Sequence, residues 1–297
     1  MPRVSYTAPA TVDEAVKALV AATGLAKVLS GGTDLLVQMK SGRLKPELIV
    51  DTKHIPGVVG IREEGDYFVI GAATPGVLIS ASQPLEHAYP GIVEGVDLIG
   101  SQQIQGRCTM AGNLCNASPA ADSVPPVIAA RGLAVVAGPG GRREVPVEEI
   151  VTGPGRTSLA KGEFVLEFKI PRPKPRQCDA YLRFIPRTEM DIAVVGCAVN
   201  VTLAEDGTCT DARVVLGAVA PTQLVVAGAA EALKGHKLDA ATLQRLDAAA
   251  QAACRPISDK RGTIEYRTKV AGVLARRAAA IAFDRAMTRG ATIAGAV

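Results

Sequence analysis

The segment SGGTD, at residues 30–34, constrains the fold of this chain more than any other part of its sequence. It directly follows the short segment AKVL, residues 26–29, that is typical of a strand, and it precedes the apolar residues 35–37. Two successive glycines let the backbone turn sharply and let its N–H groups approach an anion, and Thr33 adds a hydroxyl donor. Such a turn suits a pyrophosphate, although a plain glycine turn with Asp34 as a cap explains it equally well.

This turn matches neither of the two common phosphate-binding motifs. The Gly-Lys-Ser/Thr end of a P-loop is missing, and so is the G-x-G-x-x-G pattern of a Rossmann domain. Around the turn the sequence predicts a helix with a capping box at residues 11–22 and a strand at 48–50. It also predicts a hairpin with strands at 58–61 and 67–70, which turns near 63–66, and a second hairpin that turns near 138–141. The order of these elements predicts an α+β fold and not a doubly wound βαβ sheet.

The segment PRPKPR, at residues 171–176, interrupts the pattern. Proline fixes φ and removes an N–H donor, so this segment is typical of a domain boundary. Beyond it the sequence predicts two strands and two helices, at residues 193–203, 210–218, 240–253 and 263–287. We therefore expect one domain at residues 1–176, a second at 177–287 and a frayed tail at 288–297.

The composition excludes several classes of protein. The chain has 297 residues and a net charge of +4, with 48% hydrophobic and 21% charged residues, which is typical of a globular protein and not of one that binds nucleic acid. No stretch approaches the ~20 consecutive apolar residues of a membrane span, and residues 1–10 lack the apolar core of a secretory signal. We therefore expect a cytoplasmic protein without stable membrane insertion.

The six cysteines do not form a metal-binding pattern. None of them has C-x-x-C spacing, and the three histidines lie far apart without an H-E-x-x-H motif. A disulfide framework is not expected either, because cytosolic thiols stay reduced. The sequence thus predicts no metal ligands, and it shows no acid–base or nucleophile constellation from which a catalytic residue could be assigned.

A second segment, TMAGNLCNASPAADSVPP at residues 109–126, is rich in small residues, hydroxyls and amides and has no strong helix or strand period. A long irregular stretch inside a compact domain often binds a ligand, and a plain surface loop is the alternative. Cys108 and Cys115 have no partnering histidine, so we interpret them as small packed side chains.

Together the two segments resemble those of a known family, the FAD-binding medium subunits of molybdenum hydroxylases, which include aerobic carbon monoxide dehydrogenase and xanthine dehydrogenase. SGGTDLL at residues 30–36 is similar to the family's first loop, (A/S)-G-G-T-D-L-L, and TMAGNL with Pro119 and Asp122 is similar to its second, T-I-G-G-N-L followed by P-x-(S/A)-D. RTEMDIA at 187–193 and several positions in 259–277 resemble two further family motifs. The resemblance therefore covers nearly the whole chain.

The resemblance implies an FAD-binding domain of the vanillyl-alcohol-oxidase (PCMH) type in two α/β subdomains, plus a small C-terminal domain of three-stranded antiparallel sheet with helices. It also implies a redox relay, in which electrons pass from the 2Fe-2S clusters of a partner subunit through non-covalent FAD to an external acceptor. The partners would be a large molybdenum-cofactor subunit and a small 2Fe-2S subunit, in a dimer of heterotrimers. Membrane association through that complex is left open.

The residues that the resemblance places at the FAD are Val28, Leu29, Ser30, Gly31, Gly32, Thr33, Asp34, Ile99, Thr109, Gly112, Asn113, Cys115, Asn116, Asp122, Leu166 and Arg183. The first loop would bind the pyrophosphate and ribityl region, the second segment the pyrophosphate and adenosine, and Asp122 would accept hydrogen bonds from the cofactor. Leu166 and Arg183 would lie near the isoalloxazine ring, although Arg183 could also be a solvated charge on a strand.

The sequence departs from the family pattern at Ala111, where the family has the first glycine of a pair. Because an alanine disfavours positive φ, we expect the second segment to be shaped differently or to bind more weakly. Two alternative functions stay open, a self-sufficient flavin oxidoreductase and a non-catalytic assembly protein with a degenerate FAD site. No His or Cys stands beside the first loop to bond the flavin covalently, so non-covalent binding is expected.

Overall fold

The computed structural model describes residues 4–187 and 189–294. Its N-terminal part begins with a small parallel sheet in the order β1-β3-β2. The elements of this part are β1 (Ser5–Thr7), α1 (Val12–Ala21), β2 (Ala26–Leu29), α2 (Leu35–Lys40) and β3 (Leu48–Asp51). The predicted capping box of α1 is confirmed: the Thr11 side chain accepts from the backbone N–H of Glu14, whose carboxylate accepts from the N–H of Thr11. The glycine turn joins β2 to α2.

A five-stranded antiparallel sheet follows, in the order β4-β5-β10-β6-β7. Its strands are β4 (Ile61–Glu64), β5 (Tyr67–Gly71), β6 (Leu133–Gly138), β7 (Gly141–Pro146) and β10 (Phe164–Pro171). Both predicted hairpins are confirmed, but β4 begins at Ile61 and not at Val58. Val58 is instead buried, and its carbonyl accepts from the N–H of Ala73 at 2.8 Å, so it belongs to the core beneath the sheet.

Six short helices and a small hairpin lie between these strands, namely α3 (Gly76–Ser80), α4 (Gln83–Ala88), α5 (Pro90–Asp97), α6 (Gln102–Gln105), α7 (Met110–Cys115), α8 (Val124–Ala129), the 3₁₀ turn η1 (Val147–Glu149), β8 (Val151–Gly153) and β9 (Arg156–Thr157). The prediction that residues 109–126 are irregular is therefore wrong, because α7 and the start of α8 lie within them. Local capping explains part of the difference, since the Thr109 side chain accepts from the N–H of Gly112 at 3.0 Å.

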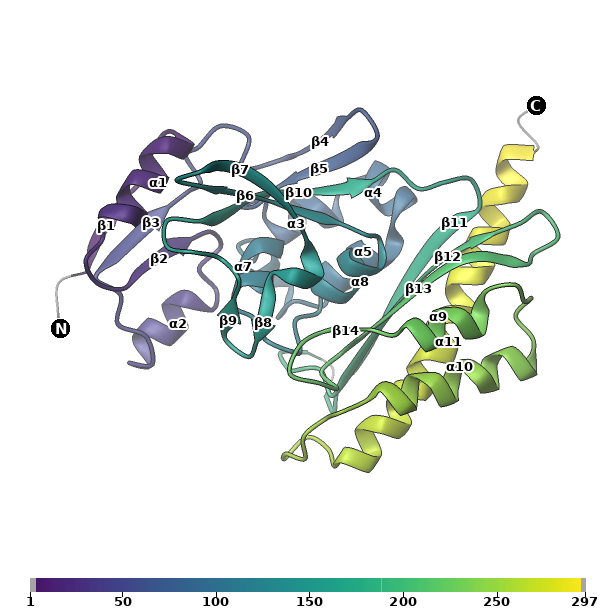
Figure 1. Cartoon of the computed structure of the whole chain (residues 1–297). Helices are drawn as coiled ribbons and strands as arrows, with labels where there is room; N and C mark the ends of the chain where they lie inside the picture. The colour runs from purple at the N-terminus through teal and green to yellow at the C-terminus, as the bar shows by residue number, and fades with distance from the viewer. Residues whose placement is uncertain (1–3, 188, 295–297) are drawn as a thin grey trace.

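The C-terminal part is a four-stranded antiparallel sheet with helices α9, α10 and α11 on its outer face (Figure 1). Its elements are β11 (Gln177–Phe184), β12 (Val195–Leu203), β13 (Cys209–Gly217), β14 (Leu224–Val225), α9 (Ala227–Leu233), α10 (Ala240–Ala253) and α11 (Ile264–Ala294). The three expected strands are present, and the two-residue β14 adds a fourth at the edge. The helix predicted at 240–253 has those same bounds.

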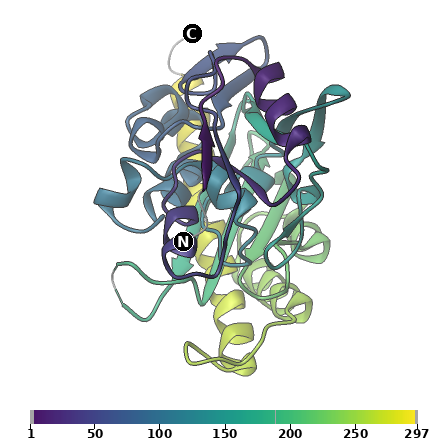
Figure 2. The same ribbon diagram turned by 90° about the vertical axis from the view of Figure 1, so that its left-hand side faces the viewer.

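The long helix α11 continues past residue 287, where the sequence predicted its end, to Ala294. Residues 288–294 are therefore helical and not part of a frayed tail (Figure 2). A tertiary contact explains the extension: the Arg289 guanidinium donates to the backbone carbonyls of Ala88 and Gln177, at 3.1 and 2.6 Å. These contacts hold the end of α11 against the rest of the molecule. Residues 295–297 of the expected tail lie outside the described residues.

The sheet β11–β14 is buried on both faces. Tyr181, Ala198 and Val215 pack into the core shared with the N-terminal part, whereas Val199 and Leu216 pack against the outer helices. Because side chains alternate along a strand, each strand supplies both cores at once. The C-terminal sheet therefore forms a middle layer between α5 and α8 on one side and α9–α11 on the other (Figure 1).

A buried carboxylate marks the contact between α5 and β11. Asp179 is 1% exposed, and its Oδ1 accepts from the N–H of Gly91 at 2.9 Å, while its Oδ2 has no hydrogen-bond partner among the described residues. Burial raises the pKa of this carboxyl to about 7, aided by the neighbouring Glu94 and opposed by that N–H bond and by Arg285 and Arg289.

We predict that Asp179 makes the stability of the protein depend on pH. Its pKa is raised on folding, so its contribution is full below the unfolded value near pH 4 and is lost as the pH rises to about 7. Urea unfolding measures the free energy of unfolding at each pH. Between about pH 4 and pH 7, this free energy should fall by about 2–4 kcal/mol less in Asp179→Asn than in the wild type. Parallel pH profiles for the two proteins would contradict the assignment.

Candidate functional site

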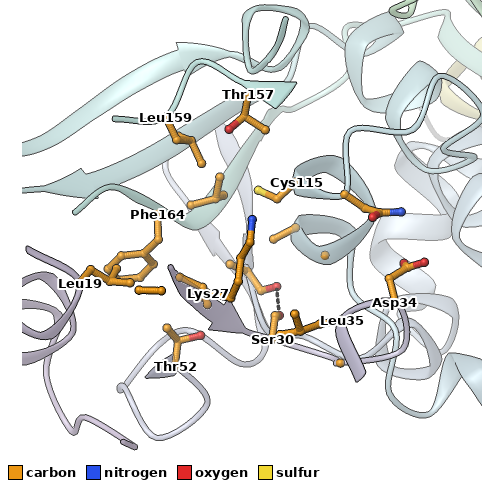
Figure 3. A pocket seen from close by; sticks show the side chains of 18 of the residues that line it. Leu19, Lys27, Ser30, Asp34, Leu35, Thr52, Cys115, Thr157, Leu159 and Phe164 are labelled. Atoms are coloured by element: carbon orange, nitrogen blue, oxygen red, sulfur yellow. Dashed lines mark hydrogen bonds between the residues drawn. The ribbon is translucent and has the colours of Figure 1, made fainter. Parts of the chain in front are cut away.

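A cavity of about 570 Å³ lies between the parallel sheet, helix α7 and the chain around β9 and β10 (Figure 3). Most of its wall comes from residues 22–28, 30–35, 108–116 and 157–165. Its size falls within the range of about 300–1,000 Å³ that is usual for small-molecule sites. The cavity therefore joins the glycine turn and the second segment in one site, as the sequence predicted.

The two glycines of the turn are needed for different reasons. A Cβ at Gly31 would lie 2.0 Å from the backbone oxygen of Arg107, so only glycine allows the two stretches of chain to come this close. Gly32 has a φ of +84°, a conformation that other residues adopt only with strain. Gly31 is thus required for the close contact with Arg107, and Gly32 is required for the conformation of the turn itself.

The backbone N–H groups of this turn are free. Within the described chain, the N–H groups of Gly31, Gly32, Thr33 and Asp34 donate no hydrogen bond to protein atoms, although these four residues line the cavity. Unpaired donors at a glycine turn are the feature with which proteins bind phosphate groups. The structure therefore supports the anion-binding interpretation of the turn over the plain turn.

Side-chain hydrogen bonds join the turn to the second segment. Ser30 Oγ donates to the carbonyl of Ala72 at 3.0 Å and lies 2.9 Å from Thr109 Oγ1, which serves as the donor in that pair. Gln38 Nε2 of α2 donates to Asn116 Oδ1 at 2.9 Å. These bonds tie the glycine turn and α2 to α7 and the residue that follows it, and all of these segments line the cavity.

The backbone strain expected at Ala111 is not present. This residue is buried within helix α7 and does not have a positive φ, and alanine is the most favoured residue in such a position. Cys108 is buried, as expected, whereas Cys115 is exposed in the cavity wall and is not a packed side chain. Helix α7 is therefore capped at Thr109, and Ala111 lies within it in ordinary helical conformation.

The structure places most of the predicted FAD-binding residues in the cavity wall. These are Val28, Ser30, Gly31, Gly32, Thr33, Asp34, Ile99, Thr109, Gly112, Asn113, Cys115 and Asn116. The four that do not line it are Leu29, Asp122, Leu166 and Arg183. Leu166 is buried in β10 and lies behind the wall, where its carbonyl accepts from the N–H of Ala72 at 3.0 Å.

Asp122 and Arg183 form a buried ion pair at 2.8 Å, with side chains 8% and 4% exposed. The hydroxyl of Tyr181 donates to the same carboxylate at 2.8 Å, and Arg183 also donates to the carbonyl of Leu98. Burial raises the pKa of Asp122 to about 6, although Arg183 opposes the rise. The interpretation of Arg183 as a solvated strand charge is therefore wrong. Through Leu98, it fixes the backbone beside Ile99, which lines the cavity.

Part of the wall comes from residues that the sequence did not indicate. Leu19, Leu159 and Phe164 form an apolar end of the cavity, Thr157 lies above it, and the side chain of Lys27 extends into its middle (Figure 3). Only Lys27 carries a sequence signal, since it is a lysine within an otherwise apolar strand. Leu19 belongs to the nearby helix α1, whereas Thr157, Leu159 and Phe164 come from segments far along the chain, and no motif contains any of the four.

Across residues 4–187 and 189–294, no group of three or more His, Cys, Asp or Glu side chains could hold a metal ion. In the same part of the chain, no helix is both long and apolar enough to cross a membrane.

Comparison with known proteins assigns both parts of the chain. Residues 2–173 match the FAD binding domain in molybdopterin dehydrogenase, and residues 180–282 match the CO dehydrogenase flavoprotein C-terminal domain. The chain is 35% identical to the medium chain of carbon monoxide dehydrogenase from Hydrogenophaga pseudoflava over 284 residues, which cover 96% of this chain and 98% of the relative. It is 31% identical to the xanthine dehydrogenase FAD-binding subunit of Escherichia coli O157:H7, covering 89% and 90% of the two chains.

A solved structure gives the same result. A chain of the reconstituted CO dehydrogenase from Oligotropha carboxidovorans superposes with a TM-score of 0.91 at 35% identity, covering 96% of this chain and 99% of that one. The fold, the cavity and these matches define a flavoprotein subunit of an oxidoreductase. The chain belongs to the FAD-binding medium subunits of molybdenum hydroxylases, of the carbon monoxide dehydrogenase and xanthine dehydrogenase type.

We predict that Gly31→Ala damages the site and the fold together. The added methyl group would overlap the Arg107 carbonyl, so the turn and the chain before α7 must move apart. Overpacking of this kind costs about 1–3 kcal/mol, and FAD affinity should fall with it. Urea unfolding and FAD titration measure the two effects.

Gly140→Ala is the matched control for this substitution. Gly140 lies in the β6–β7 turn without a positive φ, and an added Cβ there would meet no atom within 4 Å. Its unfolding free energy should stay within about 0.5 kcal/mol of the wild type. Equal losses in the two variants would show that the Gly31 contact has no special role.

Proposed function

We propose that this chain holds non-covalent FAD in the cavity and acts as the electron relay of a three-subunit enzyme. The observation that carries the proposal is the row of four free N–H groups at the glycine turn, whose residues line a cavity together with α7 and side chains of α1, β2 and β10. When bound, FAD supplies the redox chemistry, and the protein supplies binding, orientation and electrostatics. The residues present fit such a group.

Two sets of residues have different roles in this proposal. Those that line the cavity would contact the cofactor: the turn at residues 31–34 would bind the pyrophosphate, α7 would form the adjoining wall, and Ile99 would lie against the flavin. Leu29, Leu166, Asp122 and Arg183 would act from behind the wall. Arg183 would then influence the flavin by fixing the backbone at Leu98, and not by direct contact.

The partners in this proposal are a large molybdenum-cofactor subunit and a small subunit with 2Fe-2S clusters, assembled as a dimer of heterotrimers in the cytoplasm. Electrons would pass from the small subunit to FAD and on to an external acceptor. Residues 1–176 would form the FAD-binding domain and residues 177–287 the second domain, since the two large sheets are joined at residues 172–176. The assembly-protein alternative loses its basis, because Ala111 is unstrained.

Native purification tests the relay. The chain, isolated from its source without denaturation, should bring two further chains together with flavin, molybdenum and iron. Mass spectrometry, elemental analysis and the visible spectrum measure these components. A yellow monomer that turns over a small alcohol or amine by itself would show a self-sufficient flavin oxidoreductase instead.

FAD should leave the protein on denaturation. No His or Cys belongs to the turn, and the one exposed cysteine of the second segment, Cys115, lies at the end of α7 and not in the turn. After acid or heat precipitation, the flavin absorbance should appear in the supernatant. Yellow colour that remains with the precipitated chain would indicate a covalent bond.

A further inference from the structure

Lys27 occupies a position that the proposed roles do not yet explain. It lies within β2, three residues before Ser30, and its partly buried side chain extends into the middle of the cavity with its amine toward Cys115 (Figure 3). The strand thus delivers a cation to the space between the glycine turn and α7. No motif of the sequence includes this residue.

The Lys27 ammonium has no acidic partner in the part of the chain that the structure describes. The nearby lysine Lys53, in contrast, contacts Asp51 Oδ1 at 2.7 Å and the Ser30 carbonyl at 3.1 Å. A partly buried charge loses hydration, and proteins normally compensate this loss with an opposite charge or with hydrogen bonds. Lys27 therefore has an unmatched charge that a ligand in the cavity could match.

The other charged groups of the wall do not supply this match. Glu163 is held by Arg143 through two bonds of 2.8 Å and also accepts from the N–H of Ala160. Asp34 is exposed and lies at the right of the view, apart from the Lys27 amine in the centre (Figure 3). The remaining cation, Lys161, is exposed at the rim. The Lys27 ammonium therefore gives the interior of the cavity an uncompensated positive charge.

We propose that Lys27 is the counter-cation of the FAD pyrophosphate, and this inference rests on the proposed function. The pyrophosphate is the one part of oxidised FAD that is charged at neutral pH, since its adenine, sugar and ring portions are neutral. A lysine amine pairs with phosphate as a compact point charge, and it complements the directional N–H donors of residues 31–34. The cofactor would then be held by backbone donors on one side and by this ammonium on the other.

The test is a charge series at Lys27 in the full-length chain, freed of flavin and titrated with FAD by fluorescence quenching. Lys27→Met keeps the length of the side chain and removes the charge, so the Kd for FAD should rise about ten-fold at low salt. Lys27→Arg should stay within about three-fold of the wild type because the charge is retained. Added salt should weaken FAD binding to the wild type more than to Lys27→Met, because salt screens the lost interaction.

Lys161→Met is the matched control, since it removes the exposed rim lysine of the same cavity. Its Kd for FAD should change less than about two-fold. Lys27 has no ion pair or side-chain hydrogen bond within the described chain, so the unfolding temperature of flavin-free Lys27→Met should equal that of the wild type.

The possible results separate this inference from the proposed function. Failure of the wild-type chain to bind FAD would overturn both. Tight FAD binding by Lys27→Met, or the same salt dependence in Lys27→Met and the wild type, would overturn the role of Lys27 and leave the FAD site intact. Loss of affinity in both Lys27→Met and Lys27→Arg would show that shape, and not charge, matters at this position, and would also overturn the inference.

Discussion

The site depends on one close contact, in which Gly31 packs against the backbone carbonyl of Arg107. Any side chain at this position would overlap that carbonyl, so the turn after β2 and the chain before α7 can meet only with glycine. Once they meet, the Ser30–Thr109 and Gln38–Asn116 hydrogen bonds hold them in place. The cavity exists because two segments far apart in the sequence are fixed at this distance.

The C-terminal sheet contributes to the site without lining it. Arg183 of β11 reaches across to the carboxylate of Asp122 and the carbonyl of Leu98, and the ion pair is almost fully buried. Removal of either partner would leave an uncompensated charge in the interior, which is strongly destabilising. The backbone beside Ile99 and the end of the second segment are therefore anchored by the sheet behind them. This contact links cofactor binding to the part of the molecule that carries the outer helices.

Local signals predicted much of the fold. The capping box at Thr11, the hairpins near residues 65 and 140, and helix α10 all depend on side chains and turns within a few residues, and the structure confirms them. The errors occur where tertiary contacts decide. Helix α7 is short and rich in small residues, and α11 extends because Arg289 binds carbonyls of α4 and β11. An isolated six-residue helix would not be stable in water, so no local sequence pattern indicates a helix such as α7.

The sequence by itself determined the glycine turn, the second segment and, through their resemblance to a family, the class of cofactor. These features depend on backbone conformation and close approach, which a few adjacent residues encode. Only the tertiary structure decided which residues reach the cavity: Lys27 and Phe164 line it, whereas Leu166 and Arg183 lie behind its wall. The physical reason is that the lining of a site follows from strand pairing and burial between distant segments. Neighbouring residues of one strand point to opposite faces, so a motif can name a strand without showing which of its side chains face the ligand.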